Sequence, residues 1–163
     1  MRGFLLIELL VAIATAMVIL TILFYSLDGV MKLQTATESR VNLSQNSIVA
    51  MQIVSKQLAL NTRVATIEDG YLKTKDVAGN KEVSFARQVN ENGIGILYIV
   101  TKNANDLPGV NQLSDPNNVD VASLDIMVIR DDLLKITITL RDLKTSRQEE
   151  YSEYVRMYNG KVR

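Results

Sequence analysis

The residue with the clearest chemical potential is a lone carboxylate. Glu8 lies in an apolar run over residues 4–24 that contains no other charged residue. A carboxylate in hydrocarbon costs on the order of 2.5 to 3.5 kcal/mol by insertion scales, and ionisable groups inside a membrane are usually paired. The run contains no Lys, Arg or His, so the partner of Glu8 cannot be another side chain of its own segment.

The run that carries Glu8 is long enough to cross a bilayer once as a helix. Residues 4–24 would reach roughly 31 Å, close to the hydrocarbon thickness of a bilayer, and they include no Gly or Pro. An ordinary signal peptide has a shorter core and a small-x-small cleavage site after it, and residues 21–27 offer no such site. Because Arg2 precedes the span and Asp28 follows it, the positive-inside rule predicts a cytoplasmic N-terminus. The chain from about Tyr25 onward is then expected outside the cytoplasm.

Residues 3–13 resemble the N-terminus of type IV pilins and pseudopilins. In that family a short basic leader ends in Gly, a membrane prepilin peptidase cuts before Phe, and Glu stands at the fifth mature position. Gly3, Phe4 and Glu8 occupy those places, and the match covers about the first 20 residues. The resemblance implies cleavage between Gly3 and Phe4, removal of residues 1–3, N-methylation of Phe4 and a role for Glu8 in filament assembly.

Such a cleavage would create the counter-charge that Glu8 lacks. The new α-amine of Phe4 has a reference pKa of about 7.7 to 8 and is mostly cationic at neutral pH. Phe4 and Glu8 are four residues apart on one helical face, so the amine could come from the same helix or from an adjacent one. At about 4 Å the pair is worth on the order of 4 kcal/mol before desolvation. We expect it to set the register between subunits; the alternative is an acid that snorkels from the helix start without a role.

Residues 25–61 continue the helical pattern in amphipathic form. Apolar residues recur at spacings of three, four and seven, with polar residues between them. The expected apolar stripe consists of Leu27, Val30, Met31, Val41, Ile48, Met51, Val54 and Leu58. We expect the helix to continue to residue 61 and the later part of this stripe to pack under an exported sheet.

From residue 62 to 163 the pattern changes to strands and turns. Strands are predicted at residues 63–68, 71–75, 81–89, 94–101, 123–130, 133–141 and 149–158, with a hairpin turn at Asp69-Gly70 and another at Asp131-Asp132. Short connections between successive strands indicate an antiparallel sheet. The expected fold class is α+β, with a long N-terminal helix packed on a C-terminal antiparallel head domain over residues 62–163.

The amino-acid composition limits the kinds of catalytic and metal sites that this head domain could contain. The chain has no Cys and no His, and its formal net charge is zero. Zero Cys excludes thiol chemistry and a disulfide, and zero His excludes triads and metal sites built on His. No excess of Lys and Arg residues indicates binding to nucleic acid. We expect no enzymatic activity and no cofactor; a carboxylate-based exported enzyme is the rival in this class.

The irregular stretch at residues 103–119 is rich in oxygen ligands of the kind that calcium uses. Asp106 and Asp115 are its candidate acids, and some members of the resembled family bind calcium in such loops. The spacing fits no defined calcium motif, however, and Asn, Asp, Pro and Gly are what any exposed turn uses. We therefore expect no metal site here, with Asp106 and Asp115 as the residues to inspect.

The resemblance also indicates a branch of the family. Many major subunits have a Pro late in the membrane helix, but Tyr25 stands at that position here and no Pro precedes residue 108. The polar stalk at residues 47–58 and the late strands look like those of minor pilins and of the minor pseudopilins of type II secretion.

The expected function is a minor subunit that initiates or tips a pilus, a secretion pseudopilus or a competence pilus. Its implied partners are the prepilin peptidase and methyltransferase, an inner-membrane assembly platform, other subunits through helix packing, and the bilayer before assembly. The implied location is the bacterial inner membrane and then the filament. The alternative is a single-pass, signal-anchored envelope protein with an exported binding domain, which never polymerises and keeps Met1, Arg2 and Gly3.

Overall fold

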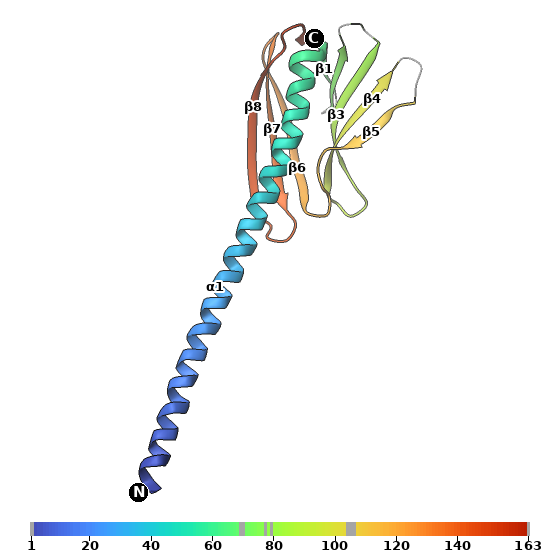
Figure 1. Cartoon of the computed structure of the whole chain (residues 1–163). Helices are drawn as coiled ribbons and strands as arrows, with labels where there is room; N and C mark the ends of the chain where they lie inside the picture. Colours follow the sequence, from blue (N-terminus) through green and yellow to red (C-terminus); the bar gives the residue numbers. More distant parts are fainter. Residues whose placement is uncertain (1, 69–70, 77, 79, 104–106, 163) are drawn as a thin grey trace. The chain divides into compact units, whose positions relative to one another are not determined.

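A computed structural model describes residues 2–68, 71–76, 78, 80–103 and 107–162, with side chains described from residue 6 onward. The chain opens with one long helix, α1 (Arg2–Lys56), which a turn of π-helix, η1 (Gln57–Asn61), extends (Figure 1). Thr62 then takes up extended backbone, with φ −100° and ψ 128°, and its hydroxyl donates to the Gln57 carbonyl at 3.0 Å. The prediction that the helical segment ends at residue 61 is confirmed.

The chain divides into two compact units within α1. The N-terminal unit is Met1–Glu38 and the C-terminal unit is Ser39–Arg163. Helix α1 is unbroken at Gly29, and an ion pair of 2.6 Å between Asp28 and Lys32 spans this position. The division falls inside a continuous helix because its side chains become buried only from Ser39 onward.

The strands of the C-terminal unit form two sheets. The first has the strand order β5-β4-β3-β2-β1-β9 and the second β6-β7-β8. All neighbours are antiparallel except β1 and β9, which run parallel. The strands are β1 (Thr62–Glu68), β2 (Tyr71–Asp76), β3 (Lys81–Val89), β4 (Gly95–Asn103), β5 (Gly109–Gln112), β6 (Val119–Arg130), β7 (Leu133–Asp142), β8 (Gln148–Arg156) and β9 (Lys161–Val162).

The α+β class is confirmed, and the strand pattern differs from the prediction in three ways. Strand β5 lies inside the stretch at residues 103–119 that the sequence indicated to be irregular, and β9 follows the last predicted strand. The strands also split into two sheets, because β6 pairs with β7 and not with β4 or β5. The hairpin turn at Asp69-Gly70 lies outside the described residues, although β1 and β2 pair up to Glu68 and Tyr71 on either side of it.

A polar junction joins the two sheets where β6 begins. The buried carboxylate of Asp120 accepts a hydrogen bond of 2.7 Å from the backbone N–H of Gly95 in β4 and one of 2.5 Å from Arg141 in β7. Arg87 of β3 donates to the Val121 carbonyl. A Cβ atom on Gly95 would lie 2.1 Å from that same carbonyl oxygen. Only glycine permits this approach between the sheets.

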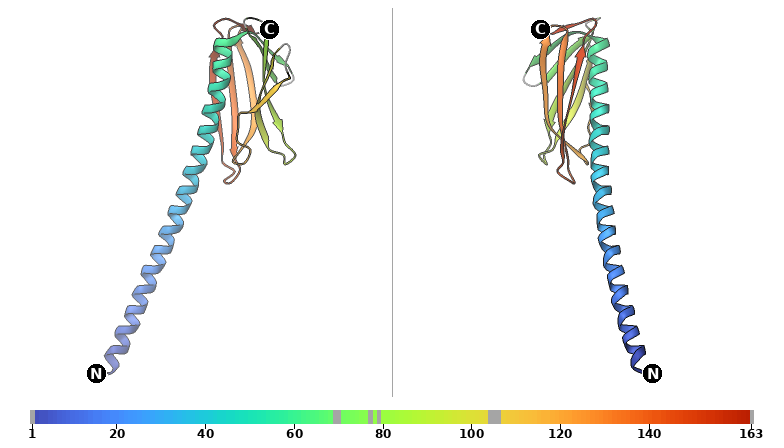
Figure 2. Two further views of the ribbon diagram at one scale, coloured as in Figure 1. Left: turned by 45° about the vertical axis from the view of Figure 1, so that its right-hand side comes forward. Right: turned by 90° about the vertical axis from the view of Figure 1, so that its left-hand side faces the viewer.

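The helix face that enters the core is only partly the predicted one. In Figure 2 the C-terminal half of α1 runs alongside the strands in both views. Its buried positions are Ser39, Leu43, Ser47, Ala50, Met51 and Val54, and Leu58 of η1 continues them. Met51, Val54 and Leu58 were predicted correctly. The remaining members of the predicted stripe are exposed: Leu27, Val30, Met31, Val41 and Ile48. The prediction missed Leu43 because small serines, not apolar residues, mark this face one turn before it and one turn after it.

Candidate functional site

The described side chains of the N-terminal unit are all exposed. From Leu6 to Glu38 none is buried, and the large apolar side chains of residues 6–24 are between 49% exposed at Ile13 and 70% exposed at Phe24. Soluble monomers rarely expose contiguous apolar patches larger than a few hundred Å². The helix is long and apolar enough to cross a membrane, which is consistent with single-pass anchoring. Exposed apolar surfaces of this size mark sites of contact with a membrane or with other proteins.

The hydroxyl groups in this apolar segment are compatible with hydrocarbon. Thr15 donates to the carbonyls of Val11 and Ala12, both at 2.9 Å, and Thr21 donates to the carbonyl of Met17 at 2.8 Å. Each hydroxyl is therefore satisfied within its own helix, as a membrane segment requires. Glu8 is the polar group for which this internal solution is missing.

Glu8 stands on the exposed surface of α1, about one turn from the helix start. Among the described residues, none forms a hydrogen bond or an ion pair with its carboxylate. Gly3 and Phe4 belong to the first turns of the same helix, and their side chains lie outside the description. Four residues of helix separate the Phe4 nitrogen from Glu8 by about 6 Å along the axis. The arrangement leaves the carboxylate available to a cation from the chain terminus or from another molecule.

The second predicted region, the stretch at residues 103–119, supplies a structural turn. Asp115 accepts hydrogen bonds from the backbone N–H of Asn117 at 3.0 Å and from the amide of Asn118 at 2.6 Å, and these bonds lower the pKa of its carboxyl. Its own N–H donates to the side chain of Asn46 on α1 at 2.9 Å. Asp115 thus anchors the start of β6 to the helix, and Asp106 lies outside the described residues.

The described acids of the C-terminal unit do not converge on one point. Within the described ranges, no group of three or more acids is arranged to hold a metal ion. Asp131 and Asp132 form the turn between β6 and β7, as predicted, and Asp132 is bonded to Arg156 of β8 at 2.8 Å. Asp131 and Asp132 therefore serve the fold, because their backbone forms the turn and the Asp132 carboxylate connects it to β8.

Two further acids are perturbed by the packing of loops and strands. Asp142 is buried, which raises the pKa of its carboxyl, but hydrogen bonds from Thr145 and Lys144 outweigh burial and leave that pKa lowered. In β8, burial and the neighbouring Glu149 raise the pKa of Tyr151 to about 12, and the Tyr151 hydroxyl donates to Glu149 at 2.6 Å. Both groups have neighbours in the same turn or strand that account for their shifts.

The sequence did not indicate how the chain returns to the C-terminal unit after β8. After β8 the chain turns back: Met157 and Val162 donate to the carbonyls of Asp132 and Asp131 at 2.8 and 2.7 Å, and Tyr158 donates to the Ala59 carbonyl at 3.2 Å. This C-terminal tail, residues 157–162, contacts the helix end, the β6–β7 turn and β1. A glycine near the chain end was the only signal for it.

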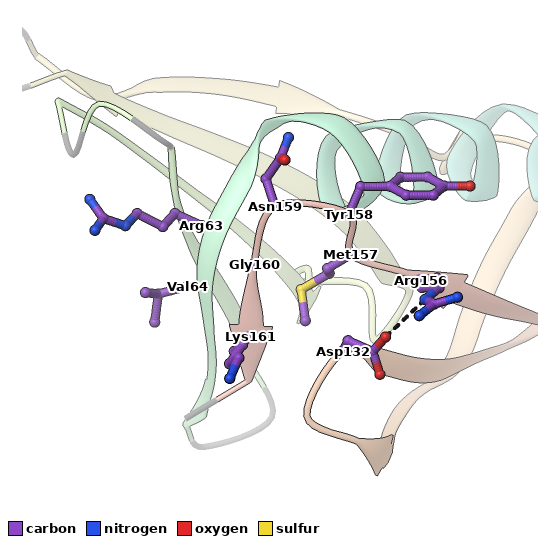
Figure 3. A pocket seen from close by; sticks show the side chains of 9 residues that line it. All are labelled: Arg63, Val64, Asp132, Arg156, Met157, Tyr158, Asn159, Gly160 and Lys161. Carbon is purple, nitrogen blue, oxygen red and sulfur yellow. Dashed lines mark hydrogen bonds and ion pairs between the residues drawn. The ribbon is translucent and has the colours of Figure 1, made fainter.

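A cavity of about 730 Å³ lies between this tail and β1. In Figure 3 the side chains of Arg63, Tyr158 and Lys161 point in different directions rather than toward a common point. The Arg156 guanidinium is occupied by Asp132. A ligand site needs convergent polar groups. We therefore interpret this cavity as a gap between the packed tail and β1 and not as a ligand site.

Comparison with known proteins found no similar protein. No family model matches the chain, and neither the curated proteins nor the solved structures contain a match to it. The site most in need of a partner is therefore identified by its chemistry: an exposed apolar helix with one unpaired acid near its beginning.

Proposed function

We propose that the chain is a minor subunit of a type IV filament, built like a minor pilin or a minor pseudopilin. The observation that carries the proposal is the isolated Glu8 on the exposed apolar surface of α1, four residues after Phe4 and next to the Gly3–Phe4 junction. A fully exposed apolar helix ahead of a compact α+β unit is what a helix-packed filament subunit needs. The chain is then the substrate of a peptidase and has no catalytic role of its own.

The proposed sequence of events starts in the inner membrane. Helix α1 crosses the bilayer with its N-terminus in the cytoplasm, and prepilin peptidase cuts between Gly3 and Phe4. Cleavage converts the Phe4 amide nitrogen into a cationic amine. Methylation of that amine leaves its charge in place. The subunit then leaves the lipid and packs its helix among other helices.

Packing of the apolar helix surface against other helices provides the energy of assembly, and Glu8 provides the register. Exposed side chains such as Leu10 and Phe24 leave lipid for other helices, where packing rather than the hydrophobic effect decides affinity. A carboxylate in that interior must be paired. The amine of a neighbouring Phe4 meets this need at one axial stagger, and other staggers leave Glu8 unpaired.

The alternative is a signal-anchored envelope protein with the same single span. It is distinguished by its mature N-terminus, since an anchored protein keeps Met1, Arg2 and Gly3. Mass spectrometry of the N-terminal peptide from the native envelope tests this directly. We expect a peptide that begins at methylated Phe4; a peptide that begins at Met1 contradicts the filament proposal.

Two substitutions separate trimming from assembly. Gly3→Tyr should block trimming and leave membrane insertion intact, because the apolar run is unchanged. Glu8→Val should be trimmed normally and fail to enter filaments, and Glu8→Asp, which keeps the charge, is the matched control. The measurements are the N-terminal mass and the amount of chain in sheared filament fractions. Incorporation of Glu8→Val at wild-type levels would remove the register role.

A further inference from the structure

One edge of β6 bonds to no strand in the part of the chain that the structure describes. The three-stranded sheet ends at β6, which pairs only with β7 (Figure 1). The first residues of β6 are covered, because Val119, Asp120 and Val121 are buried at the junction with β3 and β4. The last six residues, 125–130, have different surroundings.

Within this second half of β6, Ile126 is half-buried and packs against the core, whereas the residues from Met127 onward are exposed on both faces of the strand. Met127, Val128 and Ile129 are 60%, 46% and 43% exposed, and the flanking Asp125 and Arg130 are exposed as well. Successive side chains of a strand alternate between its two faces, so consecutive exposed residues mean that neither face is covered. An apolar strand with free backbone donors and acceptors is a template for pairing with another strand.

The other free edges of the two sheets are less suited to pairing. Strand β5 has only four residues, too few for a stable ladder by itself. Strand β8 carries Glu149, Glu150 and Glu153, and charged side chains are a common protection of an edge. Strand β9, the other edge of the six-stranded sheet, has only two described residues. Of these four edges, β6 offers the longest apolar stretch.

A bulge brings the two charges of the β6 segment onto one face. Asp125 and Met127 lie on the face opposite to the buried Leu134, and the pairing register with β7 shifts between Val128 and Arg130. A regular strand would place Arg130 on the other face from Asp125, because face alternates with every residue. The extra residue of the bulge returns Arg130 to the face of Asp125 and Met127.

The resulting edge is complementary to itself. Its acid and its base stand at opposite ends of an apolar centre, on one face. Among the described residues Arg130 has no ion pair, and Asp125 accepts only a hydrogen bond of 3.0 Å from Ser123. A two-fold axis at Met127 would bring the acid of each copy next to the base of the other, as an isologous interface requires.

We propose that the β6 edge pairs in antiparallel register with the β6 edge of a second copy of this chain. Met127 then lies opposite Met127 of the second copy, and Asp125 lies beside Arg130 of the second copy at both ends. A parallel arrangement would set Asp125 against Asp125, which is unfavourable. The pairing joins two three-stranded sheets into one continuous sheet. It does not depend on the filament assignment.

Cysteine crosslinking of the full chain tests the register. Because the sequence contains no Cys, an introduced Cys is the only thiol that can form a disulfide. Met127→Cys in detergent-solubilised protein should form a disulfide-linked dimer under mild oxidation, because directly opposite residues approach within about 4.5 to 5.5 Å. Val110→Cys on the β5 edge, 58% exposed, is the matched control and should stay monomeric. Equal crosslinking of the two variants would overturn the proposal, as would its absence in both.

Charge reversal in the Met127→Cys background tests the partner. Asp125→Arg and Arg130→Asp should each abolish the crosslink, since each places like charges together at both ends of the interface. The double variant Asp125→Arg/Arg130→Asp should restore it, because both ion pairs re-form with reversed polarity. All variants should keep the circular dichroism of the parent. Loss of the crosslink in the double variant would show that the partner is not a second copy, and would overturn the proposal.

Discussion

Glu8 and Asp142 show two ways in which this chain uses a carboxylate. Glu8 is exposed on an apolar helix and has no partner among the described residues. Asp142 is buried and its partners are local: it accepts hydrogen bonds from the backbone of Lys144 at 3.1 Å and of Thr145 at 2.7 Å, and from the Thr145 hydroxyl at 2.8 Å. Thr145 in turn bonds Ser39 of α1 at 2.8 Å.

We predict that Asp142→Asn lowers the free energy of unfolding of the C-terminal unit by about 1 to 2 kcal/mol at neutral pH, because charge-assisted hydrogen bonds become neutral ones. The carboxyl has a lowered pKa in the folded chain, so the unfolded chain binds more protons. The stabilisation is complete above the ordinary pKa of 3.8 and is lost as the pH falls through the lowered value.

Urea unfolding followed by circular dichroism at several pH values measures this difference. The wild-type and Asp142→Asn curves should diverge at pH 6 and converge in strong acid. Glu91→Gln, an exposed acid in the turn before β4, is the control and should change stability by less than about 0.5 kcal/mol. A gap between wild type and Asp142→Asn that stays constant down to strong acid would mean that ionisation of Asp142 is irrelevant.

Gly160 decides how closely the C-terminal tail approaches β1. A Cβ atom there would lie 2.4 Å from the Thr62 carbonyl oxygen and 2.9 Å from that of Arg63. We predict that Gly160→Ala displaces the tail and destabilises the unit by about 1 to 3 kcal/mol, the usual effect of overpacking. Gly109→Ala is the matched control, since its nearest contact would be 3.9 Å. Hydrogen exchange at Val162 should increase only in the Gly160 variant.

At the scale of elements, α1 is one helix with two environments. Its first part has no buried side chain among those described, and its last part packs one face against both sheets. Neither propensity nor length distinguishes the two parts. The difference arises because the strands supply a surface to cover residues 39–58, and because the first part carries nearly all of the uninterrupted apolar sequence.

We predict a large difference between two apolar truncations on α1. Leu43→Ala, at a fully buried position, should cost about 2 to 5 kcal/mol through lost burial and a cavity. Ile48→Ala, at a position 51% exposed, should stay within about 0.5 kcal/mol. Thermal and urea unfolding measure both. Comparable losses from the two would mean that Ile48 is covered in solution.

The elements that the sequence predicted well are those with their own local signal. Strands β1, β2, β3 and β7 were predicted to within one residue, because alternation and turn residues define them. Strand β5 was missed because Gly109–Gln112 has no alternation and is ordered by pairing with β4. Strand β9 has two residues and exists only because β1 lies beside it.

At the scale of the whole chain, two units share one helix, and among the described residues only the C-terminal unit has buried side chains. We predict that residues 35–163, which keep one helical turn before Ser39, form a folded and water-soluble fragment, because the buried core lies at residues 39–157. The full chain should remain in the membrane fraction after carbonate washing. Cooperative unfolding of the fragment in detergent-free buffer is the measurement. A fragment that aggregates or lacks a cooperative transition would show that the core needs the earlier helix.

The role of Glu8 stays a prediction from the sequence; the structure adds that its side chain is exposed and has no partner among the described residues. Glu8 could be singled out because its significance depends on what surrounds it along the chain: an apolar run, a preceding Gly3–Phe4 junction and no internal cation. Asp115 was predicted only as a residue to inspect. Its role in tying β6 to Asn46 depends on a contact across 69 residues, which no local pattern contains.

The sequence by itself determined the membrane-length helix, its single acid, the helix end at residue 61 and the α+β class, because periodicity, charge placement and turn residues are local properties of the chain. Tertiary structure decided which helix face is buried, how the strands divide between two sheets and where the tail returns. Those outcomes depend on which distant surfaces meet. The bulge that places Asp125 and Arg130 on one face was also decided by tertiary structure, since it is defined only by the register with β7.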